Sequence, residues 1–222
     1  MLFAFVAMRN MNTQSKLDKY ILDHIEPEDE VLKELDRETN LNVLHARMLS
    51  GHLQGQVLTM LSKMIQPKTI LEIGTFTGYS AICLSKGLQK DGRLITIEID
   101  DELESMAKKY FKKAGLENVI EQRIGSALKI IPTLNYSFDL IFLDADKKEY
   151  IQYFELVFDK VPSGGYIIAD NTLWSGKVLE KPAEDDYQTK GIIEFNSFLK
   201  NDSRIEQVIL PLRDGITVIR KK

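Results

Sequence analysis

The feature that most constrains the fold of this chain is an alternation of two kinds of segment that begins after Pro67. Short runs rich in β-branched residues alternate with amphipathic segments of helical length. The predicted strands are Thr69–Ile73, Arg93–Ile99, Val119–Ile124, Phe138–Leu143 and Tyr166–Ala169. The predicted helices between them are Tyr79–Leu88, Asp101–Ala114, Leu128–Leu134 and Glu149–Val161. This repeat is typical of a parallel sheet with helices on both faces, and the nearly continuous apolar runs fit strands buried on both sides.

The last part of the sequence departs from this alternation. Gln207–Leu210 and Ile216–Ile219 flank a short turn centred on Asp214-Gly215. Two strand-like runs joined by such a turn form a hairpin. We therefore expect the last strand to run antiparallel to its neighbour in a sheet that is otherwise mostly parallel.

The first part of the chain, residues 14–66, contains no strand-like alternation and is predicted to be a helical extension. One helix is expected to begin in Glu26-Pro27-Glu28-Asp29-Glu30, where proline and acidic residues suit a helix N-terminus. No repeat or linker divides the 222 residues, and roughly 150 residues make a domain. We predict a single domain over residues 1–222, with the α/β core at 67–222.

Residues 1–11 include an apolar stretch, Met1–Met8, that is much shorter than the roughly 20 residues of a membrane-spanning helix. The stretch lacks the basic segment that precedes the apolar part of a signal peptide, because Arg9 follows it instead. With Met8 and Met11 close behind, we expect residues 1–11 to be an over-extended start or a disordered tail, and we expect a cytoplasmic protein with no membrane partner.

Composition excludes several kinds of site. With 29 Lys and Arg against 33 Asp and Glu, the net charge is −4, which does not indicate a general binder of nucleic-acid backbones. The single cysteine, Cys83, excludes an intrachain disulfide and a multi-cysteine metal site, and three histidines do not suggest a zinc centre. Any metal would therefore need oxygen ligands, which are those of Mg²⁺ and Ca²⁺.

Polar residues at the carboxyl ends of the predicted strands are the candidate site, because ligands of open α/β sheets bind there. After the first strand, Gly74 and Gly78 let the backbone approach a ligand, although their spacing is neither a dinucleotide fingerprint nor a P-loop. Glu98 ends the second strand and can accept hydrogen bonds from both hydroxyls of a ribose, although a lone acid there can equally adjoin a helix N-terminus. With Gly125-Ser126-Ala127, which leaves room for an adenine ring, these positions favour a ribose-bearing cofactor.

The fourth and fifth predicted strands end in acidic residues. Asp144 and Asp146 follow the fourth strand, and Asp170-Asn171 follows the fifth. Neighbouring carboxylates repel each other unless they are protonated or bridged by a cation. Each Asp alone could equally be a helix N-cap. The whole set, with an Asn carboxamide added, favours an oxygen-ligand site for Mg²⁺ or Ca²⁺.

These motifs resemble those of class I S-adenosylmethionine-dependent O-methyltransferases, and more narrowly those of the cation-dependent catechol and caffeoyl-CoA group. The resemblance extends from about residue 27 to the C-terminus. It is carried by Leu71–Ser80, Phe142–Lys147, Asp170–Gly176 and Leu210–Thr217. It implies a doubly wound, Rossmann-like methyltransferase sheet, S-adenosylmethionine as methyl donor, a divalent cation (Mg²⁺ or Ca²⁺) and a homodimer.

The resemblance also implies roles for individual positions. The residues implied to contact the cofactor are Ser50, Glu72, Gly74, Thr75, Ser80, Glu98, Ala127, Asp144 and Asp146, with Glu98 on the ribose and Ala127 against the adenine. Asp144, Asp170 and Asn171 would bind the metal, which makes Asp144 a catalytic residue as well. Lys147 would take the proton of the acceptor hydroxyl, and Trp174 would form a wall of the acceptor pocket.

The implied chemistry follows from the acidity of the acceptor. A catechol hydroxyl has a pKa near the value of about 10 for tyrosine and is mostly protonated at neutral pH. A divalent cation could chelate two vicinal hydroxyls and stabilise the phenolate, and it would lower the pKa of a nearby Lys147. We therefore predict a metal-dependent O-methyltransferase acting on a small catechol-like acceptor. Caffeoyl-CoA itself is not expected, because residues 42–53 and 178–189 depart from the pattern of the plant enzymes.

Three other functions are weaker interpretations of the same sequence. The acceptor could be a hydroxyuridine of tRNA, bound by a basic patch made of Lys177, Lys181, Arg213, Arg220, Lys221 and Lys222. A protein that binds the cofactor without catalysis would leave the acidic cluster without a purpose. A dinucleotide-dependent oxidoreductase would need a different glycine spacing.

Overall fold

The computed structural model describes residues 16–222 of the chain, so the predicted tail at residues 1–11 lies outside the described residues. The strands are β1 (Thr69–Ile73), β2 (Arg93–Glu98), β3 (Ile120–Ile124), β4 (Leu140–Leu143), β5 (Tyr166–Ala169), β6 (Ile205–Leu210) and β7 (Ile216–Lys221). The α-helices are α2 (Glu30–Asn42), α3 (Gly51–Ile65), α4 (Tyr79–Ser85), α5 (Glu104–Lys113), α6 (Ala127–Ile130), α7 (Tyr150–Phe158) and α8 (Tyr187–Lys200), and residues 16–24 are also helical. Short 3₁₀ helices are η1 (Ala46–Met48), η2 (Asp101–Leu103), η3 (Ile131–Thr133), η4 (Lys147–Glu149) and η5 (Trp174–Leu179).

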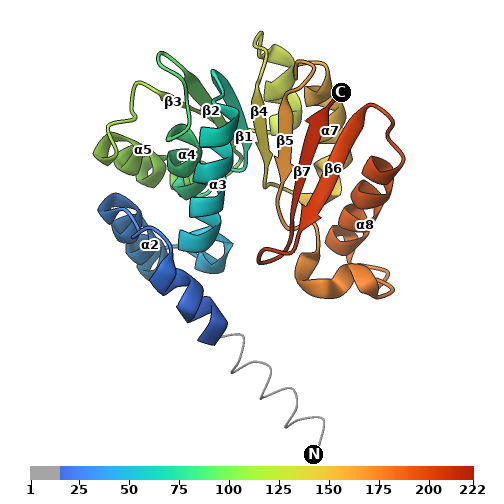
Figure 1. Cartoon of the computed structure of the whole chain (residues 1–222), viewed down its shortest axis with the longest axis horizontal. Coiled ribbons are helices and arrows are strands. Elements are labelled where there is room, and N and C mark those ends of the chain that lie inside the picture. Colours follow the sequence, from blue (N-terminus) through green and yellow to red (C-terminus); the bar gives the residue numbers. More distant parts are fainter. Residues whose placement is uncertain (1–15) are drawn as a thin grey trace, which may run out of the picture.

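The strands of residues 16–222 form one seven-stranded mixed sheet (Figure 1). Their order is β3-β2-β1-β4-β5-β7-β6. The first five strands pair in parallel, and β7 lies between β5 and β6 and is antiparallel to both. The predicted Rossmann-like sheet, mostly parallel with an antiparallel C-terminal hairpin, is therefore confirmed.

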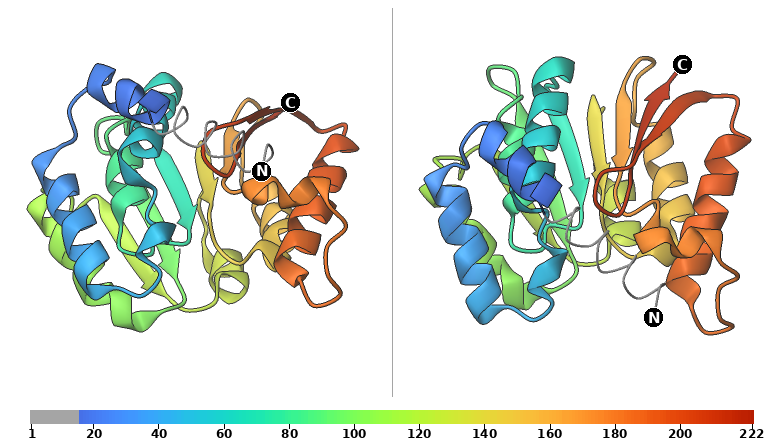
Figure 2. Two further views of the ribbon diagram at one scale, coloured as in Figure 1. Left: turned by 90° about the horizontal axis from the view of Figure 1, so that it is seen from below. Right: turned by 60° about the horizontal axis from the view of Figure 1, so that its bottom comes forward.

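Helices cover both faces of the sheet (Figure 2). Successive strand residues point to opposite faces, so each central strand contributes to two apolar cores. Leu71 and Ile73 of β1 belong to the core formed with α6, α7 and α8. Ile70 of the same strand belongs to the core formed with α2, α3, α4 and α5. Burial on both faces explains why the central strands are apolar almost without interruption.

The N-terminal segment is helical in separate pieces rather than throughout. α2 begins at Glu30, and the carboxylate of Asp29 caps it by accepting a hydrogen bond from the Val31 N–H, as the acidic run before it predicted. Residues 25–29 and 43–50 interrupt the α-helices. The second interruption contains His45 in a left-handed conformation and leads directly into α3.

The sequence did not lead us to expect α8. Its N-cap is Asp186, which accepts hydrogen bonds from the backbone and hydroxyl of Thr189. Ile192, Phe195 and Leu199 then bury one face of the helix at helical spacing. Gly191 has low helix propensity and weakens this pattern. A capping signal followed by apolar residues at i+3 and i+7 could have identified the helix.

The centre of the sheet holds its topological switch point. β1 and β4 are neighbours, although β2 and β3 lie between them in sequence, so the connections leave the two strands in opposite directions and open a crevice between their carboxyl ends. Gly74 follows β1 with φ 104°, and a Cβ atom there would lie 2.2 Å from the Asp144 carbonyl oxygen. Only glycine lets these two strand ends approach so closely.

Candidate active site

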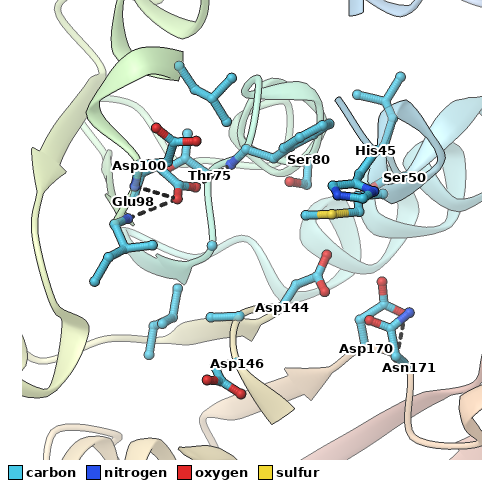
Figure 3. Close-up of a pocket in the computed structure, with 18 of the residues that line it drawn as sticks. His45, Ser50, Thr75, Ser80, Glu98, Asp100, Asp144, Asp146, Asp170 and Asn171 are labelled. Carbon is cyan, nitrogen blue, oxygen red and sulfur yellow. Dashed lines mark hydrogen bonds between the residues drawn. The ribbon is translucent and has the colours of Figure 1, made fainter. Parts of the chain in front are cut away.

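A cleft of about 1590 Å³ opens at this switch point. It is lined by the carboxyl ends of β1, β2, β4 and β5, by residues 42–50, and by the turn between β6 and β7. Twelve of the predicted site residues line it: Ser50, Gly74, Thr75, Ser80, Glu98, Ala127, Asp144, Asp146, Lys147, Asp170, Asn171 and Trp174. Figure 3 shows several of them projecting into the same space from different elements.

Glu98 is fixed at the end of β2 by backbone donors. One carboxylate oxygen accepts from the Ile99 and Asp100 N–H groups at 2.8 and 3.0 Å, and the other accepts from the Phe76 N–H at 2.7 Å. A carboxylate has about four acceptor positions, so three backbone bonds leave capacity for one more donor. This arrangement fits a ligand that presents hydroxyl groups to the edge of the cleft, as a ribose does.

Glu72 is the predicted site residue that does not line the cleft. Its side chain is completely buried behind the wall, where the Thr96 hydroxyl donates to Oε2 at 2.5 Å and Oε1 has no hydrogen-bond partner. Burial raises the pKa of Glu72 to about 8. Thr96 in turn contacts the hydroxyl of Thr75 at 2.5 Å. What Glu72 does in this structure is support the turn after β1, and its contact with a cofactor stays a prediction.

The acids after β4 and β5 meet at the cleft floor. Figure 3 shows the side chains of Asp144, Asp170 and Asn171 gathered on one side of the cleft. Asp170 is 4% exposed, and its carboxylate accepts from the Gln54 amide at 2.6 Å and from the Asn171 N–H at 2.7 Å. Burial, with the negative charge of Asp144 added, raises the pKa of Asp170.

This donor set fits a hard divalent cation. Two carboxylates and an amide oxygen are ligands that Mg²⁺ and Ca²⁺ accept, and a cation would relieve the repulsion that raises the pKa of Asp170. Within residues 16–222, no group of three or more His, Cys, Asp or Glu side chains is placed to hold a metal. A metal site built on Asp144 and Asp170 would include the carboxamide oxygen of Asn171 as a further protein ligand.

Lys147 brings a buried positive charge to the same acids. It is 7% exposed, and its Nζ lies 2.8 Å from Asp144 Oδ1 and 5.2 Å from the centre of the Tyr150 ring. Gln188 of α8 holds the turn that carries it, because its amide oxygen accepts from the Lys147 N–H and its amide nitrogen donates to Asp146, both at 3.0 Å. Gly191 lets α8 approach this turn closely.

Asp146 acts as a helix cap as well as a cleft residue. Its Oδ1 accepts from the Lys148 N–H at 3.1 Å at the start of η4, which is the capping role that each Asp alone could have. Burial acts to raise its pKa, but bonds from the Lys148 ammonium, the Lys148 N–H and Gln188 outweigh burial and lower it. Asp146 is thus held as a carboxylate facing the cleft.

Trp174 lies in a strained loop after β5. Asn171, Trp174 and Ser175 all have positive φ values, between 47° and 58°. The loop is tied to the β6–β7 turn, since the N–H groups of Leu173 and Trp174 both donate to the Asp214 carbonyl at 2.7 and 3.1 Å. It forms one wall of the cleft, and residues 42–50 contribute another part of the lining.

Sequence reasoning missed the polar residues that position the acids. Gln54 contacts Asp170, Gln188 contacts Asp146 and Lys147, and Arg213 contacts Gln54. None of the three lies at the carboxyl end of a parallel strand, so the rule that identified the acids does not reach them. Arg213 belongs to one of the motifs that carried the resemblance, but the role expected for it was in the basic patch of the tRNA alternative and not beside the acids.

The fold and the cleft define a Rossmann-like protein that binds a ribose-bearing ligand beside an acidic centre. The family model described as O-methyltransferase matches residues 23–222, and the chain belongs to that family. A caffeoyl-CoA O-methyltransferase of Medicago sativa is 35% identical over 229 residues, covering 97% of this chain and 92% of that protein. Caffeoyl-CoA O-methyltransferase 1 of Nicotiana tabacum is 36% identical, covering 97% and 95%.

Solved structures agree with the curated relatives. The O-methyltransferase TomG of Streptomyces achromogenes, in complex with SAM, has a TM-score of 0.86 and 30% identity, covering 93% of this chain and 96% of that one. The SAH-bound methyltransferase PaMTH1 of Podospora anserina has a TM-score of 0.88 and 28% identity, covering 96% and 97%. The chain is a SAM-dependent O-methyltransferase of the caffeoyl-CoA O-methyltransferase type, as the motifs predicted. In the part that the structure describes, no helix is both long and apolar enough to span a membrane.

Proposed function

We propose that this enzyme methylates one hydroxyl of a small catechol-like acceptor with the help of a divalent cation. The observation that supports the proposal is the convergence of Asp144, Asp170 and Asn171 in the same cleft as Glu98 and Lys147. Mg²⁺ and Ca²⁺ both suit this oxygen ligand set. The bound cation would supply Lewis-acid stabilisation of a phenolate.

The cofactor end of the cleft holds the methyl donor in this proposal. Glu98 accepts from one ribose hydroxyl, Ala127 lies against the adenine, and Ser50, Thr75 and Ser80 surround the methionine end. Fixing the donor and the acceptor in one cleft converts a bimolecular reaction into a positioned one, which is the orientational part of catalysis. The methyl group passes from the sulfonium to the acceptor oxygen, and the neutral thioether leaves.

The acceptor proton goes to the Lys147 amine in this proposal. Its Nζ lies 2.8 Å from the Asp144 carboxylate, which keeps the side chain pointed at the acidic centre. Trp174 and residues 42–50 then enclose a flat acceptor from the side. The lysine must lose its own proton before the reaction, so it works as a general base only in the deprotonated form.

A tRNA hydroxyuridine has less support as the acceptor. The relatives from Medicago sativa and Nicotiana tabacum are caffeoyl-CoA enzymes rather than tRNA enzymes. Several residues of the expected basic patch are engaged elsewhere: Lys177 with Asp186, Arg220 with Glu206, Arg213 with backbone carbonyls, and Lys221 and Lys222 with carbonyls of residues 158, 161 and 203. A small acceptor is therefore the better hypothesis.

A homodimer and a cytoplasmic location also remain proposals. Met60 and Met64 are 57% and 76% exposed and lie one turn apart on α3, which supports an apolar contact on that helix. Light scattering after size exclusion would measure the mass of the particle. A mass of about 25.4 kDa at micromolar concentration would contradict the dimer.

The metal proposal is tested by methyl transfer to a panel of catechols from labelled S-adenosylmethionine. We expect activity only with Mg²⁺ or Ca²⁺ present, loss of activity with EDTA, and loss of at least about 100-fold in Asp144→Asn. Asp159→Asn removes one exposed carboxylate at the end of α7 and is the matched control, with activity unchanged. Full activity in EDTA would overturn the metal role, and methylation of undermodified tRNA alone would overturn the small acceptor.

A further inference from the structure

Arg213, in the turn between β6 and β7, reaches across the cleft entrance to the segment before α3. Its guanidinium donates to three backbone carbonyls: that of Leu49 at 2.9 Å, that of Arg47 at 3.4 Å, and that of Ser50. A carbonyl oxygen has two lone pairs, so each of these can accept from the guanidinium in addition to any backbone partner. One side chain therefore holds a segment that is more than 160 residues away in the sequence.

The same guanidinium also sets the orientation of a buried amide. Arg213 Nη1 lies 3.3 Å from Gln54 Oε1, and Gln54 Nε2 donates to Asp170 Oδ2 at 2.6 Å. A guanidinium has donors only, so the Gln54 amide must turn its oxygen to Arg213, which leaves its nitrogen to donate to Asp170. Gln54 is 1% exposed, which leaves no water to replace either partner.

The turn that carries Arg213 is itself tied to the loop after β5. Arg213 has φ 48°, a conformation that few residues other than glycine adopt. Within the turn the Gly215 N–H donates to Leu212, and across it the Thr172 N–H donates to Gly215. These hydrogen bonds fix the position of the turn that carries Arg213 relative to the loop that follows Asn171.

We propose that Arg213 is a positioning residue of the active site, acting through Gln54 on Asp170. It fixes the amide of Gln54 so that the Asp170 carboxylate stays turned towards Asp144, and it holds residues 47–50 along the cleft wall. The inference rests on the proposed function, because the consequence of a misplaced Asp170 is weaker cation binding. Arg213 touches neither the acceptor nor the reacting atoms in this role.

The test measures Mn²⁺ binding to the purified full chain by electron paramagnetic resonance, with no acceptor or methyl donor present. Mn²⁺ takes the same oxygen ligands as Mg²⁺. Arg213→Met and Gln54→Leu should each raise the Kd for Mn²⁺ at least about tenfold, as losses of residues that orient metal ligands do. Because the two residues act in series, the double variant should be no weaker than the worse single variant. Arg213→Lys keeps a donor and should recover part of the affinity.

The control is Arg220→Met, which removes an exposed arginine from the same hairpin outside the cleft. Its Kd should equal that of the unmodified chain. Equal Kd values for Arg213→Met and the unmodified chain, or additive losses in the double variant, would overturn the inference. If the unmodified chain binds no Mn²⁺, the proposed metal function fails. In that case, hydrogen exchange of the backbone amides of residues 47–54 tests the positioning role of Arg213. Faster exchange in Arg213→Met but not in Arg220→Met supports the role, and equal exchange in the two variants rejects it.

Discussion

Lys147 carries a charge that is almost removed from water and points at Asp144. If it accepts the acceptor proton, Lys147→Met should lower kcat by about 10²–10⁴-fold, the usual contribution of a positioned acid or base. The KM for S-adenosylmethionine should change little, since the lysine lies on the acidic side of the cleft. Initial rates with labelled donor measure both constants. Lys200→Met, at the exposed end of α8, is the control, and a kcat in Lys147→Met equal to the control would contradict the role.

Glu72 makes the stability of the protein depend on pH. Burial raises its pKa from 4.5 to about 8, so between these values the folded chain keeps a proton that the unfolded chain releases. The free energy of unfolding then falls by about 1.4 kcal/mol per pH unit from this group as pH rises, and the fall stops above pH 8. Glu72→Gln removes the titration. Its Tm relative to the unmodified chain should rise from pH 5 to 8 and then stay level.

The control for this measurement is Glu117→Gln, which makes the same replacement at an exposed carboxyl outside the core. Calorimetry without ligand measures all three proteins. A pH-independent Tm difference between Glu72→Gln and the unmodified chain would show that Glu72 is ionised in the folded state. The assignment of a protonated, buried carboxyl would then be wrong.

The residues that sequence alone predicted for the site share one property, their place directly after a parallel strand. Asp144, Asp170 and Glu98 could be expected in one cleft because the strand rule brings them there. Gln54 and Arg213 could not be predicted, because each acts through a contact that is distant in sequence. Gln54 contacts Asp170, 116 residues away, and Arg213 contacts Gln54, 159 residues away. Glu72 lies within a strand motif, but its side chain points into the core, because a strand residue and its neighbour face opposite sides.

At the scale of elements, α8 presses on the turn that carries Lys147. A Cβ atom at Gly191 would lie 2.5 Å from the Lys147 carbonyl oxygen and 2.9 Å from the Lys148 Cα. Gly191→Ala should therefore push η4 and cost about 1–3 kcal/mol of stability, as overpacking does. We expect a lower Tm together with a kcat reduced roughly tenfold, because a misplacement near 1 Å can cost up to about 10² in rate.

The comparison for α8 is Ser197→Ala, an exposed position whose hydroxyl bonds only to Ile193 of the same helix. Thermal unfolding and steady-state rates measure both variants. If Gly191→Ala loses stability but keeps its full kcat, the packing of α8 does not control the position of Lys147. If it loses neither, the helix accommodates the methyl group by shifting as a whole.

Element boundaries were predictable where burial is uniform. The bounds of β1 and β5 agree with the sequence pattern, and the other strands are shorter or longer by up to two residues at an end. Helix predictions were less accurate, because 3₁₀ turns precede α5 and α7 and follow α6. Such turns depend on tertiary contacts of the cleft loops, and the hydrophobic periodicity of the sequence carries no information about those contacts. α8 was missed because its apolar face includes a glycine.

At the scale of the whole molecule, binding of a ligand in the cleft should raise the stability of the folded chain. A ligand that binds only the folded state stabilises it by about 2.7 kcal/mol at 100 times its Kd. For a chain of this size, that corresponds to a Tm increase of about 5–10 °C. We expect this increase with S-adenosylhomocysteine, measured by calorimetry. At the same ligand concentration, the Tm of Glu98→Gln should rise much less than the Tm of Glu117→Gln. Equal increases in Tm would show that Glu98 does not contact the cofactor.

The order of the strands has a consequence for how the protein is made. β7 lies between β5 and β6 but follows both in the chain, so β5 keeps an unpaired edge until residues 216–221 have been synthesised. A domain folds as a unit, so a nascent chain that lacks residues 216–221 cannot complete this sheet. Arg213 and Asp214 arrive only with the final hairpin. A stalled chain without this hairpin would therefore lack part of the active site and leave the edge of β5 open to pairing with another chain, which invites aggregation.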